Sequence, residues 1–325
     1  MNTTPDTAAL AARTMLATLT VSTWSARKLD KTTTAKTTHD AGAIQDAARV
    51  NKHLLAGQDA ALKAVQAIAS AARSDLYALT LPWNDAGPRI LSADLWPRLN
   101  AKLQAHQAAF TVAVTAFADD YTQARHRAQF ALGQMFSAND FPAVENIYSK
   151  FYFDFSYEPL PTAGDFRVEL ADADADMIRK DMDARANARF AAAMKETWNR
   201  LFEAIQHIAV TLPDYEAGNV KRFNDSLTGN LRDLLAILPG LNITNDPALT
   251  AIADRAAAEL SGIDAQTLRD SPATRSRAAT SAAGIVDMMA AHMRGAAAPL
   301  PTPAPVIVKP IAPVFDLFTA PVRAA

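Results

Sequence analysis

Residues 190–213 read FAAAMKETWNRLFEAIQHIAVTLP, and this stretch decides the fold class. Its large apolar side chains recur at steps of three and four residues: Phe190, Met194, Trp198, Leu201, Ile205, Ile208 and Leu212. That spacing places them on one face of an α-helix, in a seam like that of a coiled coil. Pro213 ends the pattern, because proline has no backbone N–H to donate to a helix. We therefore predict a long helix over 171–212.

A second long helix is predicted over 94–128, and a shorter one over 60–79. Both carry apolar residues at helical spacing, among them Leu99, Phe110 and Phe117 in the first. Amphipathic helices are also expected over 223–238, 249–260 and 274–293. The predicted fold class is mainly α: a helical bundle with two long antiparallel helices, 94–128 and 171–212. Trp198 and Phe202 are expected to be buried against the 94–128 helix.

Three segments favour strands and predict a small accessory β-sheet. Residues 16–24 alternate apolar and hydroxyl side chains, which is typical of a strand. In the stretch 151–158 the aromatic residues fall on every second position: Phe151, Phe153, Phe155 and Tyr157. FRVEL (166–170) is expected to return as the hairpin partner of 151–158. The aromatic face is either a stacking platform for bases or the buried face of a sheet under helices.

The composition supports a helical body followed by a tail. The 325 residues are rich in alanine and include 11 glycines, which favours helix. From Ala296 onward the composition changes, and seven of the 18 prolines lie between Pro299 and Pro321. We predict an extended, disordered Pro/Ala-rich tail over 296–325. The expected organisation is a helical region with a small sheet over 1–170, a bundle region over 171–295 packed with it as one body, and the tail.

Charge and residue usage exclude some classes of protein. The formal net charge is −2, which argues against a surface wholly devoted to nucleic acid or anionic lipid. Without cysteine the chain forms no disulfide and no Cys-ligated zinc site, which fits a reducing compartment. No signal peptide is evident, and no apolar run approaches the roughly 20 residues that span a bilayer. We expect a soluble protein of the host-cell cytoplasm with no membrane partner.

Catalytic and metal-binding patterns do not stand out. The run ADADADMIRKDMD (171–183) holds five aspartates but no glycine for the bend of a calcium loop. Aspartates at a helix N-terminus oppose the helix dipole favourably, and we prefer that interpretation. The six histidines are scattered, and no phosphate loop or nucleophile elbow is present. We expect no catalytic residue, no metal, no cofactor and no enzymatic activity.

One candidate binding site is a basic segment after a tryptophan. Its residues are Trp24, Arg27, Lys28, Lys31 and Lys36. An aromatic ring beside cations is how single-stranded nucleic acid is held without sequence readout. The alternative is a tryptophan packed in the core, followed by a solvated basic loop or frayed helix.

A second candidate is a short apolar motif in the tail, which predicts partner docking by Phe315, Asp316, Leu317 and Phe318. It resembles the bacterial sliding-clamp-binding pentapeptide of the type Gln-Leu-(Ser/Asp)-Leu-Phe. Asp316, Leu317 and Phe318 match that pattern, while Val314 and Phe315 stand in place of Gln and Leu. The alternative is that this motif docks on the protein's own helical body.

Several short blocks resemble an uncharacterised family of tailed-phage proteins, known only as a domain of unknown function. The blocks are WSARK (24–28), LPW (81–83) with the following DAG (85–87), and PTAGDFRV (161–168). The resemblance spans roughly residues 14–210. Members of this family are often encoded near MoxR-type AAA+ ATPases, von Willebrand-type partner proteins or DNA-metabolism genes. The resemblance implies a phage origin and an accessory role, and it supplies no catalytic residues.

These observations favour two hypotheses about function. The first is a non-enzymatic adaptor or scaffold in host-cell DNA metabolism or with an AAA+ ATPase. Its partner would be that ATPase, a sliding clamp or another replication protein, and self-association is an option. The second is a single-strand nucleic-acid-binding protein of phage recombination or replication.

Overall fold

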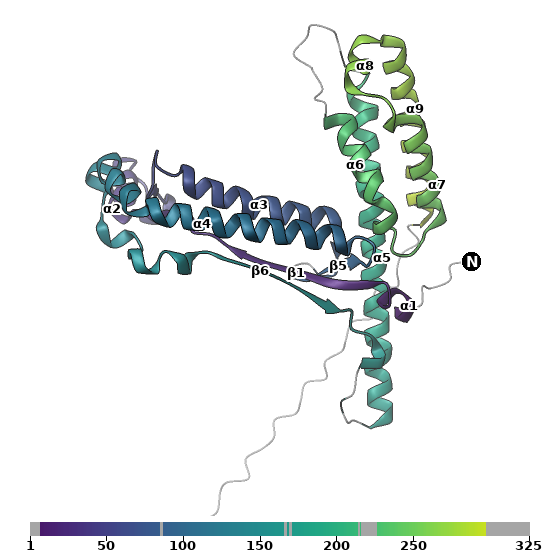
Figure 1. Cartoon of the computed structure of the whole chain (residues 1–325), viewed down its shortest axis with the longest axis horizontal. Helices are drawn as coiled ribbons and strands as arrows, with labels where there is room; N and C mark the ends of the chain where they lie inside the picture. Colours follow the sequence, from purple (N-terminus) through teal and green to yellow (C-terminus); the bar gives the residue numbers. More distant parts are fainter. Residues whose placement is uncertain are drawn as a thin grey trace, which may run out of the picture.

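A computed structural model of the chain describes residues 7–84, 87–165, 168, 171–213, 215 and 226–296. The described part is mainly helical with a small antiparallel sheet, which confirms the predicted class at that level. Two long assemblies meet in Figure 1: an arm built on α3 and α4, and a column built on α5. Among the described residues, no helix is both long and apolar enough to span a membrane.

The arm consists of two helices that lie on a two-stranded ribbon. Helices α3 (Ala60–Leu79) and α4 (Trp96–Leu132) lie side by side along its length (Figure 1). Strands β1 (Thr14–Ser22) and β6 (Tyr152–Pro159) pair antiparallel beneath them, with Leu19 opposite Phe155. Strands β5 (Arg89–Ser92) and β4 (Leu81–Pro82) complete the sheet in the order β4-β5-β1-β6.

The ends of the arm carry shorter elements. Helix α1 (Thr7–Ala11) precedes β1 near the column. At the far end lie α2 (Lys31–Asp40) and the small ribbon of β2 (Arg27–Leu29) with β3 (Asn51–His53). Short 3-10 turns fill most of residues 133–150.

The aromatic face of β6 packs under the helices, as one of the two interpretations of its sequence expected. The ring of Phe153 lies 5.3 Å from that of Phe110 in α4, measured between centroids. The two predicted strands 16–24 and 151–158 correspond to β1 and β6. The predicted third strand, 166–170, lies outside the described residues except for Val168, which is exposed and in no strand.

The column is built around α5 (Asp172–Thr211), with Asp172 and Asp174 in its first turn as expected. Helices α6 (Ser226–Leu241) and α9 (Pro272–Ala296) pack against it. Between them come α7 (Pro247–Ala256), its π-helical continuation Ala257–Ser261, and α8 (Ala265–Asp270). The predicted tail, 296–325, lies outside the described residues except for Ala296.

The predicted pairing of the two long helices is not confirmed. Helix α4 lies along α3, and α5 lies along α9, while only the first turns of α4 share a core with α5 (Figure 1). Trp198 is buried, but its ring stacks on His292 of α9 at 4.6 Å between centroids. Phe202 is only partly buried against the column core. An apolar stripe shows that a helix face is buried, but it does not name the helix that covers it.

Two hydrophobic cores hold these assemblies. One fills the column and reaches Leu95, Leu99 and Leu103 at the start of α4. The other runs along the arm, from Leu62 of α3 to Tyr121 of α4. Gly240 in α6 sits so close to Leu95 that a methyl group there would clash with the leucine side chain. The N-terminal end of α4 therefore packs tightly against the column.

Candidate functional site

A groove of about 780 Å³ opens where the arm meets the column. Four helices supply its walls, and we call it the junction groove. Four of its lining residues are apolar and buried or partly buried, and we call them its floor: Leu79, Leu227, Leu234 and Ile237. We call its charged and polar lining residues its rim: Asp75, Arg98, Lys102, Arg200, Glu203, His207, Asn230 and Asp233.

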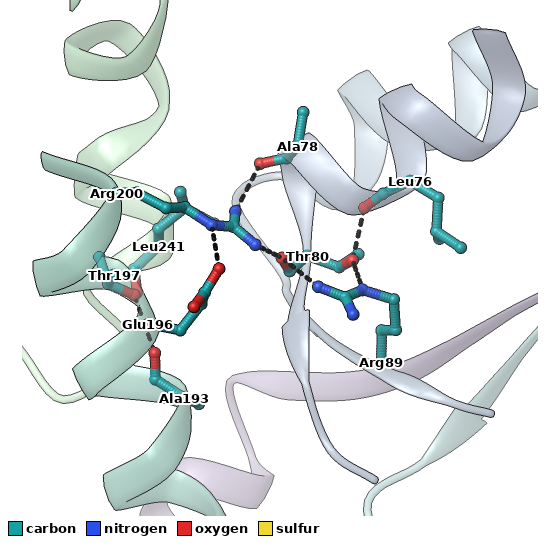
Figure 2. A network of polar contacts seen from close by, with 9 residues as sticks. All are labelled: Leu76, Ala78, Thr80, Arg89, Ala193, Glu196, Thr197, Arg200 and Leu241. Carbon is teal, nitrogen blue, oxygen red and sulfur yellow. Dashed lines mark hydrogen bonds and ion pairs between the residues drawn. The ribbon is translucent and has the colours of Figure 1, made fainter. Parts of the chain in front are cut away.

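Arg200 of α5 fixes one wall by capping the end of α3, as Figure 2 shows. Its guanidinium donates to the carbonyls of Ala78 and Thr80 at 3.2 and 3.1 Å, and its Nε donates to Glu196 at 3.0 Å. The last carbonyls of a helix have no partner within the helix, and a cation there opposes the helix dipole. This single side chain therefore links the arm to the column.

Arg89 of β5 adds a second set of contacts where the arm meets the column. The Nε of Arg89 donates to the Thr80 hydroxyl at 2.7 Å, and its guanidinium lies 4.4 Å from the centre of the Tyr77 ring (Figure 2 shows the Thr80 contact). Burial, and secondly the charge of Arg200, lower the pKa of Arg89. The Thr197 hydroxyl of α5 donates to the carbonyl of Ala193 at 3.1 Å and shares this proton with the carbonyl of Leu241 at 3.4 Å, at the end of α6 (Figure 2). The walls of the groove are thus held together before any partner binds.

Asp75 organises the arm side of the rim. Its carboxylate contacts Lys102 at 2.8 Å and His106 at 2.7 Å. Burial raises the pKa of Asp75, but hydrogen bonds from Lys102 and His106 outweigh that effect, so the pKa is lowered overall. An apolar floor inside a rim of both charges is typical of a protein-docking surface, since the rim fixes orientation while the floor excludes water.

The structure places the basic segment at the far end of the arm. Trp24 packs into the arm core, with its ring 6.2 Å from Phe117 and 5.8 Å from Tyr121 between centroids. Lys28 contacts Asp140 at 2.8 Å. The remaining cations, Arg27, Lys31 and Lys36, are exposed on β2 and α2. Of the two alternatives, loop or frayed helix, residues 31–40 form a helix, and Asp30 caps it by accepting from the Thr33 N–H at 2.8 Å.

A nearly buried charge cluster near that segment was not anticipated from the sequence. Lys52 Nζ lies 2.6 Å from Asp140, 3.4 Å from Asp30 and 2.7 Å from the carbonyl of Met135. A hydrogen bond from Lys28, and then one from Lys52, lower the pKa of Asp140. The hydrogen bond to Asp140 is the main cause that raises the pKa of Lys52. This cluster joins three segments that are distant in sequence.

The tail candidates, Phe315, Asp316, Leu317 and Phe318, lie outside the described residues. Within the described residues, no group of three or more His, Asp or Glu side chains is placed to hold a metal ion.

Comparison with known proteins gives no match: no protein-family model, no curated protein and no solved structure is similar to this chain.

Proposed function

We propose that this protein is a non-enzymatic adaptor of phage origin that binds a protein partner in host-cell DNA metabolism or an AAA+ ATPase complex. The junction groove is the observation that carries the proposal, because its floor is apolar and its walls are fixed by Arg200 and Arg89. The phage origin rests on the sequence resemblance alone. One block of that resemblance, 81–83, lies at the junction, where Trp83 packs edge-on against Phe190.

The chemistry of the groove favours an amphipathic helix of the partner as its occupant. The groove is bounded by helices, so a further helix packs its apolar stripe between their side chains in the ordinary way. Leu227, Leu234 and Ile237 meet that stripe, while Arg98 and Asp233 meet charges on either side of it. A small anion would meet too many carboxylates on this rim to be the preferred ligand.

A charge in the floor should abolish docking. We expect Leu234→Asp to weaken binding of the purified partner more than tenfold, because the carboxylate would be desolvated in the complex. The partner is first captured by the full chain from infected cells, and its affinity is then measured by calorimetry. Val112→Asp on the exposed face of α4 is the matched control and should leave the affinity unchanged. Equal binding by both variants would contradict the assignment of the groove.

The exposed cations at the end of the arm favour single-strand nucleic-acid binding as a second function. Arg27, Lys31 and Lys36 are all exposed, and Lys28 remains half-exposed beside Asp140. Because Trp24 packs against Phe117 and Tyr121, this function would rest mainly on phosphate contacts.

The salt dependence of binding tests this second function. Each phosphate contact to a single strand contributes about 0.7 to the slope of log K against log salt. Replacing Arg27, Lys31 and Lys36 by Ala should reduce the slope by about 2 if all three contact phosphates. Lys28 is kept so that Asp140 retains both lysines. A control with Lys180, Lys195 and Arg294 replaced by Ala should keep the original slope; equal slopes in all three proteins would exclude this site.

A further inference from the structure

The outer edge of β6 is open among the described residues, where β1 is its only strand neighbour. Val21 of β1 and Phe153 of β6 lie directly opposite each other. Both of their carbonyls accept from helix side chains: Val21 from Arg73 at 2.7 Å, and Phe153 from Gln107 at 3.2 Å. In an antiparallel ladder, every second residue pair has its N–H and C=O groups pointing away from the partner strand. We assign Val21 and Phe153 to such a pair, because both of their carbonyls contact helix side chains.

The alternation of an antiparallel strand then gives Phe155 and Tyr157 the same outward direction as Phe153. The backbone groups of Phe155 and Tyr157 lie along this open edge, which is a template for pairing with another strand. At Phe153 the outward carbonyl already accepts from Gln107 of α4, and it would accept a second hydrogen bond from a paired strand. The side chains of these three residues lie on the helix-facing side and are partly buried. The other side of β6 is polar and exposed, with Tyr152, Asp154, Ser156 and Glu158.

We propose that this edge pairs with the β6 edge of a second copy of this chain, in an antiparallel register centred on Phe155. This register brings Phe153 opposite Tyr157 of the second copy on the aromatic side. On the polar side it brings Asp154 opposite Ser156, and Tyr152 opposite Glu158. Aromatic pairs stabilise antiparallel strands. The Ser156 hydroxyl can donate to the Asp154 carboxylate of the second copy, while the Tyr152 hydroxyl donates to Asp154 of its own strand at 3.2 Å. The contact is isologous, as two-fold symmetry requires.

The charges select this register over its two neighbours. Shifting the pairing one way places Asp154 opposite Asp154 of the second copy. Shifting it the other way places Asp154 opposite Glu158. Carboxylates directly opposite each other are destabilising, so only the register centred on Phe155 pairs most of the strand without such a contact.

The ends of the strand fit the same arrangement. In this register Pro159 of the second copy comes opposite Phe151. Phe151 lines a groove of about 490 Å³ with Phe110, Tyr148 and uncharged α4 side chains such as Gln107. Proline has no N–H and is tolerated at the end of an edge strand. The groove therefore accepts an apolar ring where the ladder ends. The proposal does not depend on the junction groove or on its partner.

Sedimentation of the full chain over a concentration series tests the proposal. The wild-type protein should reach twice the monomer mass. Ser156→Asp places a carboxylate opposite Asp154 at two symmetry-related positions, which should weaken the dimer roughly tenfold. Ser156→Asn is the matched neutral control and should leave the dimer intact. A monomeric wild-type protein, or a dimer that Ser156→Asp leaves unchanged, would overturn the proposal.

Two further measurements separate a disrupted interface from a disrupted fold. Adding Asp154→Lys to Ser156→Asp converts the repulsive contacts into opposite-charge pairs and should restore the dimer. Hydrogen exchange of the Phe155 and Tyr157 amides should be slow in the dimer and fast in the Ser156→Asp monomer. Slow exchange of these amides in that monomer would show that the chain covers its own edge, and would also overturn the proposal.

Discussion

Trp198→Ala is expected to lower the free energy of unfolding by about 3–5 kcal/mol, the range for deleting a large buried aromatic side chain. The indole is 7% exposed and stacks on His292 of α9. Its Nε1 donates to Asp246 at 3.0 Å, and the same carboxylate caps α7 by accepting from the Ala248 N–H. The substitution removes a contact between α5 and α9 and weakens the start of α7. Urea unfolding followed by circular dichroism measures the change.

Two matched variants show which part of Trp198 is responsible. Trp198→Phe keeps an apolar ring but leaves Asp246 without its indole donor, and we expect a loss of about 1–3 kcal/mol. Phe130→Ala removes a ring that is 77% exposed on α4, and we expect a change below about 0.5 kcal/mol. A change below about 1 kcal/mol for Trp198→Ala would mean that the seam of α5 does not support the column.

The positions of the helices were predictable because the spacing of apolar residues is a local property of each segment. The stripe in 60–79 is α3 to the residue, and the seam that ends at Pro213 lies in α5. The choice of partner was not predictable from such stripes, since apolar faces of similar width fit one another in many combinations. The contacts that decide it here are specific and distant, such as Arg200 on the carbonyls of α3 and Trp198 on His292.

In the sheet, too, strand positions were predictable from the sequence, but strand pairing was not. Alternation revealed β1 and β6, but it did not show that they pair with each other across more than 100 residues of sequence. Strand β5 has only four residues, Arg89–Ser92, and its burial pattern shows three consecutive buried positions without alternation. Such a short buried strand has no periodic signal, so its position is not predictable from the sequence pattern.

The candidate sites depended even more on tertiary structure. The junction groove takes its rim from four helices, and nothing in the local sequence of Asp75 signals Lys102 or His106 as its partners. The basic segment was visible as a run of cations. Only the fold shows that Lys28 pairs with Asp140, while the other cations of the segment are exposed.

Lys52→Met is expected to lower the free energy of unfolding by about 3 kcal/mol at neutral pH. Removing one partner of a buried ion pair costs about 3–5 kcal/mol, because the remaining charge is left without compensation. We expect the lower end of that range, since Lys28 still contacts Asp140 at 2.8 Å. Lys63→Met is the matched control: Lys63 is 68% exposed beside Asp59, and its loss should cost less than about 0.5 kcal/mol.

The pH dependence of this loss identifies its cause. Asp140 and Asp30 have pKa values lowered in the folded protein, Asp140 chiefly by Lys28 and Lys52, and Asp30 chiefly by the Thr33 N–H. Their stabilisation is therefore present above the unfolded pKa of about 3.9 and disappears as the pH falls through the lower folded value. The raised pKa of Lys52 keeps it charged at neutral pH, so its contribution is lost only in strongly alkaline solution. Wild type and Lys52→Met should therefore differ most near neutral pH. The difference should begin to shrink below about pH 4 and disappear once the pH has fallen through the lower folded values, where protonated carboxyls no longer need a cation. A difference that stays constant down to pH 3 would assign the loss to packing of the lysine stem instead of to its charge.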